Sequence, residues 1–136
     1  MIDNQTLIDD FRSNRGQVTQ GYFKGRRLLL LTTKGAKSGR PLTVPLAFTE
    51  DGDRLLVAAS KGGHPAHPAW YHNLVANPEV EVELGEERFR ARATAVASGE
   101  ERRRLYDRHA EDKPGFLDYE KKTSREIPIV ILERLG

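Results

Sequence analysis

A short basic loop, residues 32–41, is predicted between two strands and holds the first candidates for chemistry. Gly35 and Gly39 allow the backbone to turn its N–H groups toward one point, and such a concavity binds anions. Lys37 and Arg40 add positive charge and charge-assisted hydrogen bonds. The G-x-x-x-x-G-K-[ST] pattern of a phosphate-binding P-loop is absent. Taken alone, the segment therefore fits either an anion site or a solvated hairpin loop.

A second candidate follows a predicted strand, where Ala58 and Ala59 lead into Ser60, Lys61 and paired glycines. Small side chains at a strand end let a flat ring approach the backbone closely. The Lys61 ammonium can meet a further anion there. Taken alone, this segment also fits an ordinary turn.

The third candidate is the segment 67–74, with the sequence His-Pro-Ala-Trp-Tyr-His-Asn-Leu. Pro68 suits the first turn of a helix, which places Trp70 and Leu74 on one face. The free N–H groups at a helix start favour negative charge, so this segment can also face an anion. Trp70 is the sole tryptophan, and a packing role in the core also explains it.

Three histidines, His64, His67 and His72, lie near one another in this region of the sequence. Their spacing matches no H-E-x-x-H zinc site, and the chain has no cysteine to supply a thiolate. We therefore predict no metal site.

The chain has 136 residues, the size of one ordinary domain, and we expect a single domain over 1–136. Its net charge is only +2 although 31% of its residues are charged, so composition alone names no charged partner. No nucleic-acid-binding motif is present, and we expect no nucleic acid to bind. No apolar run approaches the roughly 20 residues of a bilayer span, and the start lacks a secretory signal. The expected location is therefore the cytoplasm.

The N-terminal segment 1–16 is predicted as a short amphipathic helix, with Asp3 or Asn4 as its cap and Gly16 at its end. Its apolar residues have the spacing of one helix face. Strands are predicted after it by buried runs and by alternation of apolar and polar residues. Their ranges are 27–33, 42–49 and 54–59, the last two joined by a hairpin turn at Asp51-Gly52.

A second hairpin is predicted around a two-residue turn at 85–86, where residues whose numbers sum to 171 face each other. One face carries glutamates opposite arginines, and the other carries Val82 opposite Phe89 toward the core. The charged face accounts for many of the arginines as solvated sheet surface. The predicted ion pairs are Glu79 with Arg92, Glu81 with Arg90, and Glu83 with Arg88.

The last third of the chain is predicted to hold two helices and a final strand. Ser98 and Glu101 form a capping box for a helix that continues to about Asp112. A short helix is expected over 116–123 and a strand over 127–132. About six antiparallel strands, with few helices between them, predict a mainly β fold: a barrel with flanking helices.

Taken together, the three candidate segments resemble the deazaflavin (coenzyme F420)-dependent nitroreductase and quinone reductase family. The most specific part is Ser60-Lys61-Gly62-Gly63 followed by the 67–74 segment and Asn77-Pro78. The resemblance covers the chain from about residue 20 to its end. Three further stretches match it: residues 32–39, Pro45-Leu46 and residues 119–128.

This resemblance implies a split β-barrel of the FMN-binding kind, with F420, a flavin-like ring with a phosphate and a polyglutamate tail, as its cofactor. It also implies hydride transfer from reduced F420 to an electron-poor acceptor such as a quinone, an enone or a nitroaromatic. The residues that it implies for cofactor binding are Ala36, Lys37, Ser38, Gly39, Arg40, Pro41, Pro45, Leu46, Ala58, Ala59, Ser60, Lys61, Trp70, Tyr71 and Asn73.

Roles follow from the same resemblance. Residues 36–41 are expected to hold the phosphate and tail, with Lys37 as the chief charge. Pro45 and the residue after it are expected along the ring. Trp70, Tyr71 and Asn73 are expected to close the pocket. Ser60 or Tyr119 is expected to deliver a proton, with solvent as the alternative source.

The chain departs from the family in two places. Leu42 stands where the family often has arginine, and the stretch 113–119 keeps only Tyr119 of the several tyrosines in nitro-reducing members. An FMN-binding split-barrel oxidoreductase and a non-catalytic F420 carrier stay open as alternatives. The sequence also leaves a homodimer open, and it allows at most a peripheral contact of the N-terminal helix with the inner face of the cell membrane.

Overall fold

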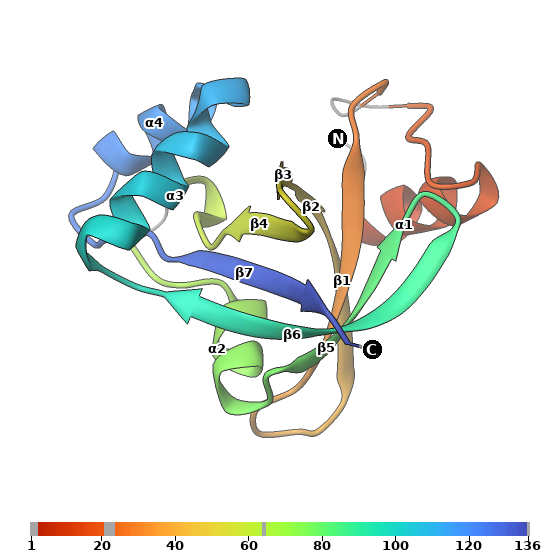
Figure 1. The fold of residues 1–136 in the computed structure, drawn as a ribbon. Helices are drawn as coiled ribbons and strands as arrows, with labels where there is room; N and C mark the ends of the chain where they lie inside the picture. The colour runs from red at the N-terminus through yellow and green to blue at the C-terminus, as the bar shows by residue number, and fades with distance from the viewer. Residues whose placement is uncertain (1–2, 21–23, 64, 136) are drawn as a thin grey trace.

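The computed structural model describes residues 3–20, 24–63 and 65–135, and its main element is one curled antiparallel sheet (Figure 1). The seven strands have the spatial order β2-β1-β5-β6-β7-β4-β3. The strands are β1 (Leu28–Lys34), β2 (Pro41–Ala47), β3 (Thr49–Asp51), β4 (Arg54–Ala58), β5 (Glu79–Leu84), β6 (Glu87–Val96) and β7 (Ile129–Arg134). The helices are α1 (Asn4–Ser13), the short 3-10 helix η1 (Lys61–Gly63), α2 (Ala69–Ala76), α3 (Gly99–Asp112) and α4 (Gly115–Lys121).

One stretch of chain closes the sheet into a half-barrel. β2 and β3 follow each other in the sequence with only Phe48 between them, yet they lie at opposite ends of the strand order. β2 pairs with β1, whereas β3 pairs with β4, so the chain leaves one edge of the sheet at Phe48 and joins the other. The sheet must therefore curl until its two edges meet at this residue. This is the split β-barrel expected from the resemblance.

The prediction of a single strand over 42–49 is wrong, because the structure divides that stretch at Phe48. Among the residues that the structure describes, the division gives seven strands rather than about six. The alternation of Val44, Leu46 and Phe48 continues unbroken through the division, so the pattern carries no sign of it. The hairpin predicted at Asp51-Gly52 does join β3 to β4.

The hairpin of β5 and β6 has the predicted register, with facing residues whose numbers sum to 171. The predicted ion pairs are wrong, because the side chains pair diagonally across the strands. Arg88 binds Glu81, and Arg90 binds Glu79 at 3.4 Å. Glu83 is left for a partner outside the hairpin.

Arg12 of α1 is that partner. Its Nε lies 3.0 Å from one carboxylate oxygen of Glu83, and its Nη2 lies 2.8 Å from the other. Glu83 is only 9% exposed, so it is part of a helix–sheet contact rather than of the solvated sheet surface. Two parallel charge-assisted hydrogen bonds, together with the buried Ile8 and Phe11, therefore hold α1 on the sheet.

The two ends of α1 differ in how well the sequence predicts them. Asp3 caps the helix as predicted, since its carboxylate accepts a hydrogen bond from the Thr6 N–H at 2.8 Å. The helix ends at Ser13, earlier than predicted. Gly16 instead turns the chain with a φ of 83° beside the β5–β6 turn, where a Cβ would lie 2.4 Å from the Gly85 Cα.

Apolar side chains cover both faces of the sheet. Inside the half-barrel, residues of β1, β4, β5, β6, β7 and α2 form the largest core cluster, which includes Trp70. On the outside, α3 and α4 pack on β4 and β7 through a cluster around Leu105 and Tyr106. α3 begins after Ser98 as predicted, but the Ser98 side chain makes no capping hydrogen bond.

Within residues 3–20, 24–63 and 65–135, no helix has the length and apolar character needed to cross a lipid bilayer. The same residues contain no group of three or more His, Cys, Asp or Glu side chains placed to hold a metal ion. His64, one of the three clustered histidines, lies outside the described residues.

Replacing Glu83 by Gln removes the negative charge of the helix–sheet contact and keeps the side-chain shape. Hydrogen bonds from Arg12 hold the pKa of Glu83 below its usual value, so the carboxylate stabilises the folded state above that usual value. We expect Glu83→Gln to lower the free energy of unfolding by about 1 kcal/mol at neutral pH. This stabilisation is lost as the pH falls through the lowered folded pKa, so the difference should shrink in acid.

Urea unfolding followed by circular dichroism at several pH values measures this difference. Glu86→Gln is the control, because Glu86 lies exposed in the turn of the same hairpin. Equal losses in the two variants, or a loss that does not change with pH, would contradict the role given to Glu83.

Candidate active site

A cavity of about 1100 Å³ lies between the two edges of the curled sheet. One wall is β2, which pairs with β1 on one side and has no strand on its other side among the described residues. The other wall is the end of β4 with the turn that follows it, and residues of α3 and α4 cover the side. Phe48, where the two edges meet, also lines the cavity.

The unpaired edge of β2 presents a definite set of backbone groups. In an antiparallel pair, a residue points its N–H and C=O to the same side, and successive residues alternate. Proline has no N–H to give to a ladder, so Pro41 and Pro45 occupy positions whose backbone C=O groups point away from β1. Thr43 and Ala47 each lie two residues from one of these prolines along the strand, so their backbone N–H and C=O groups also point away from β1. A planar ring along this edge would therefore meet more backbone carbonyl groups than N–H groups.

The structure brings many of the predicted site residues together at this cavity. They come from β2, the end of β4, α2 and α4, which are far apart in the sequence. Ala59 and Tyr71 lie behind the wall: Ala59 is fully buried, and the Tyr71 ring packs on His67 with centroids 4.8 Å apart. The predicted residues that line the cavity are Pro45, Leu46, Ala58, Ser60, Lys61, Trp70 and Tyr119.

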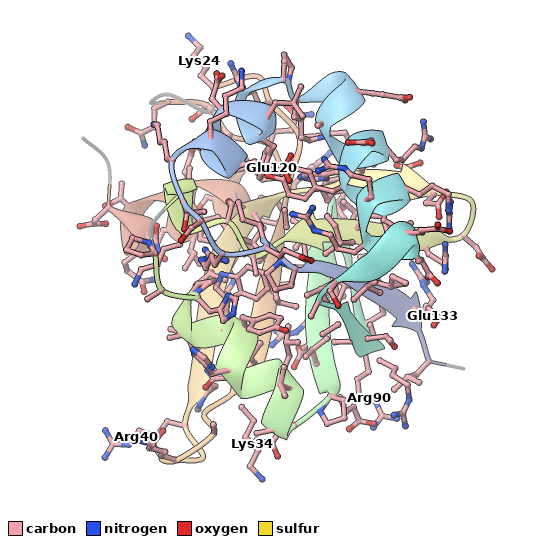
Figure 2. All side chains as sticks on the ribbon, turned by 90° about the vertical axis from the view of Figure 1, so that its left-hand side faces the viewer. Lys24, Lys34, Arg40, Arg90, Glu120 and Glu133 are labelled. Carbon is pink, nitrogen blue, oxygen red and sulfur yellow. The ribbon has the colours of Figure 1, made fainter. Side chains whose placement is uncertain are left out.

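Residues 36–41 of the basic loop do not line this cavity. They are exposed at the end of the molecule next to α2 (Figure 1), and Figure 2 shows the Arg40 side chain pointing away from the body there. Asn73 of α2 holds the loop, because its Oδ1 accepts from the Ala36 N–H at 3.0 Å and its Nδ2 donates to the Thr33 hydroxyl at 3.1 Å. Asn73 therefore positions the basic loop rather than lining the cavity.

Three N–H groups of the basic loop are not available to an anion, because they donate hydrogen bonds within the loop. Gly35 and Gly39 donate to carbonyl groups of the loop at 2.8 and 3.0 Å. The Arg40 N–H donates to the Ser38 hydroxyl at 3.1 Å. An anion at this loop would therefore meet the side-chain charges of Lys37 and Arg40.

Arg125 organises the turn after β4, a role that the sequence does not reveal because its partners lie on other elements. Its Nη2 donates to the carbonyl oxygens of Ala59 and Ser60 at 3.1 and 2.9 Å, and its Nη1 lies 2.9 Å from His67 Nδ1. A guanidinium only donates, so neutral His67 carries its proton on Nε2. Burial, and to a smaller extent the charge of Arg125, lowers the pKa of His67, so the ring is neutral at pH 7.

α4 packs directly against the turn formed by η1. Gly63 has a φ of 83°, and a Cβ there would lie 2.8 Å from the Lys122 Cβ and 3.0 Å from the Tyr119 carbonyl oxygen. Only glycine fits this conformation and this spacing. The contact therefore fixes Tyr119 relative to Ser60, the two residues predicted to deliver a proton.

A second group of cations, not predicted from the sequence, lines the cavity near Phe48. Its members come from the segment before β1 and from α3 and its end, so no single motif marks them. We call this group the cationic end. It consists of Arg26, Arg27, Arg108 and Lys113.

A buried histidine supports the wall beside the cationic end. His109 is fully buried, and its Nδ1 lies 2.9 Å from the Thr49 hydroxyl, which also accepts a hydrogen bond from Lys113 Nζ at 3.1 Å. Burial, and to a smaller extent the charge of Lys113, lowers the pKa of His109 to about 4, so the ring is neutral at pH 7. The Thr49 hydroxyl is therefore held in the cavity wall from two sides.

Replacing Gly63 by Ala should push α4 away from the turn, and we expect the free energy of unfolding to fall by about 2 kcal/mol. Gly52→Ala is the matched control, since Gly52 has a φ of 64° and no atom within 4 Å of the added Cβ. That variant carries only the backbone strain, about 1 kcal/mol. Urea unfolding of both variants measures the difference, and equal losses would contradict the close packing of α4 on Gly63.

Comparison with known proteins agrees with this geometry. Residues 5–134 match the family model described as F420H(2)-dependent quinone reductase. Over 126 residues, the chain is 40% identical to the F420H(2)-dependent quinone reductase Rv1261c of Mycobacterium tuberculosis, a match that covers 91% of this chain and 85% of that protein.

Two solved structures resemble this chain in both sequence and fold. One described as an F420-H2 dependent reductase, FDR-A, is 41% identical with a TM-score of 0.71, and the match covers 78% of this chain and 93% of that one. Another, described as a domain-swapped dimer, has the same identity and TM-score, with 78% and 79% covered. Since the family model spans nearly the whole sequence and the half-barrel agrees with solved relatives, this chain belongs to the F420H(2)-dependent quinone reductase family.

Proposed function

We propose that this chain binds coenzyme F420 and uses its reduced form to reduce a quinone-type acceptor. The observation that carries the proposal is the cavity of about 1100 Å³ that Pro45, Ser60 and Trp70 line in a member of this family. Small-molecule sites typically occupy roughly 300–1,000 Å³. The cavity is therefore large enough for a planar ring with an acceptor stacked on it.

The walls of the cavity also fit a flat heterocycle. Pro45, Leu46 and Trp70 give it apolar surfaces, and Ala58 leaves room for a close approach to the end of β4. The unpaired edge of β2 supplies backbone carbonyl and N–H groups that can hydrogen-bond with polar atoms at the rim of a ring. Apolar walls with a few placed polar groups are the usual composition of cofactor sites.

The basic loop lies within reach of an acidic tail. From Pro45 to Pro41 the strand rises roughly 13 Å at the usual spacing. A phosphate and glutamate tail that leaves the ring along β2 would therefore reach Lys37 and Arg40. Lys61, exposed at the cavity, offers another cation beside the ring.

When bound, reduced F420 supplies the hydride that an electron-poor ring accepts. The residues of this chain orient the reacting rings, exclude water and hold a proton for the reduced acceptor. Ser60, which is 7% exposed, and Tyr119 both line the cavity, so we propose either hydroxyl as the proton donor. The Tyr119 ring packs edge-on against Phe116 with centroids 5.1 Å apart, which limits the directions of its hydroxyl.

Quinones are the primary acceptors in this proposal, and enones and nitroaromatics are secondary ones. Of the tyrosines typical of nitro-reducing members, only Tyr119 is present in the stretch that contains it. Leu42, at the position where the family often has arginine, packs against the core cluster inside the half-barrel. The basic loop therefore depends on Arg40 and Lys37 for its charge.

The proposal also covers the oligomeric state of the protein and its location in the cell. The solved relative described as a domain-swapped dimer supports a homodimer for this chain. We place the protein in the cytoplasm and expect contact with the inner face of the cell membrane to be peripheral at most, because α1 carries charges of both signs. Nucleic acid has no part in it, since Arg88 and Arg90 on the sheet surface pair with glutamates.

Replacing Lys37 by Ala should weaken F420 binding about tenfold, which is the loss expected for one charge-assisted contact with the tail. A tail-less form of the deazaflavin, without phosphate and glutamates, should bind the variant as well as it binds the wild type. Lys24→Ala is the control, because Figure 2 shows Lys24 at the opposite end of the molecule from Arg40. Fluorescence titration of both ligands measures the affinities.

Oxidation of F420H2 with menadione then tests the activity. Failure to bind either deazaflavin at tens of micromolar would refute the cofactor assignment, and a purified protein with flavin absorbance would favour the FMN alternative. Tight F420 binding without oxidation by any quinone would instead identify a carrier.

A further inference from the structure

We propose that the cationic end of the cavity binds an anionic group carried by the electron acceptor, such as a carboxylate, a sulfonate or a phosphate. This inference rests on the proposed function, because it names the class of acceptor that the same cavity takes. An acceptor of this class has a quinone-type ring at the level of Pro45 and Trp70 and a negative substituent that extends toward Phe48.

Three cations of this end make contacts with the wall of the cavity. Arg27 binds the Glu50 carboxylate at 2.7 Å, and Arg108 donates to the Glu50 carbonyl at 3.1 Å. Lys113 donates to the Thr49 hydroxyl at 3.1 Å. Side chains that are ordered before a ligand arrives lose less conformational entropy when they bind it.

The carboxylates that pair with Arg27 and Arg108 are exposed and hold these two cations weakly. Glu50 is the one carboxylate among the described residues that line the cavity, and Arg108 also approaches Glu111 at 3.4 Å. The Arg27 and Glu50 side chains are 68% and 55% exposed, so solvent screens their ion pair and makes it weak. An incoming anion can therefore compete with Glu50 while Arg27 keeps its position over the Phe48 ring, 5.1 Å from the centroid.

The cationic end and the basic loop lie at opposite ends of β2. The strand runs from Pro41, in the basic loop, to Ala47, next to Phe48, a span of roughly 20 Å at the usual rise per residue. Figure 2 shows Arg40 at one end of the molecule and Lys24, in the segment just before Arg26, at the other. A cofactor tail that reaches the basic loop therefore leaves the cationic end to the acceptor.

The test compares two quinones that differ by one negative charge and one methyl group, a methylnaphthoquinone with a carboxyethyl side chain and its methyl ester. Trp70 is the sole tryptophan and lines the cavity, so quenching of its fluorescence measures binding to the cofactor-free protein without turnover. We expect the carboxylate to bind about tenfold more tightly than the ester at low salt. The preference should disappear when the ionic strength exceeds about 0.5 M, because salt screens charges over a few ångströms.

The double variant Arg27→Gln/Arg108→Gln removes two cations and keeps polar side chains of similar length. The ratio of the two affinities should fall to about one in this variant, because the cations that favour the carboxylate are gone. The tenfold preference that is lost corresponds to about 1.4 kcal/mol. Arg104→Gln is the matched control, because Arg104 is exposed on the same helix α3 and does not line the cavity. The same ratio in all three proteins, or no preference in the wild type, would overturn the proposal.

A second titration separates the acceptor from the cofactor tail as the source of the anion. F420 and its tail-less form are titrated against the wild type and the double variant. If the ratio of the affinities for F420 and its tail-less form is the same in the double variant as in the wild type, the cationic end binds the acceptor and not the tail. Selective weakening of F420, with the quinone preference retained, would assign the cationic end to the tail and overturn the proposal.

Turnover is scored separately from binding. If F420H2 is oxidised neither by menadione nor by either of these two quinones, the reductase function proposed above fails. The Trp70 titrations still decide on the cationic end in that case, because they need neither cofactor nor turnover.

Discussion

The structure depends on a single stretch of backbone that belongs to both edges of one sheet. Residues 41–51 pair with β1 before Phe48 and with β4 after it, so the sheet cannot be flat. This closure is also what leaves a space between the unpaired side of β2 and the end of β4. The cavity is therefore a result of the topology, and the side chains around it only adapt its walls to a ligand.

Around that cavity, several polar residues act on the backbone of the site. Asn73 holds the basic loop to α2, Arg125 holds the carbonyl groups at the end of β4, and Thr49 is held by His109 and Lys113. Each of these contacts satisfies a polar group that would otherwise be poorly solvated. The site is consequently organised before any ligand enters, which favours tight and specific binding.

The sequence predicts the local parts of this structure well and the long-range parts poorly. The register of the β5–β6 hairpin follows from one turn and one alternation, and the family pattern marks Ser60 and Trp70 because those residues lie in continuous motifs. The division at Phe48 is invisible because the alternation runs straight through it. The pairing of Arg12 with Glu83 and the gathering of the cationic end both join segments far apart in the chain, and no periodicity records such contacts.

The two prolines of β2 have a consequence beyond the site. An unpaired strand edge is a template on which a foreign strand can add, and proteins protect such edges against aggregation. Pro41 and Pro45 both point to that edge and remove N–H donors that an intruding strand would need. The edge can thus stay open to a small flat molecule while it resists growth into a continuous intermolecular sheet.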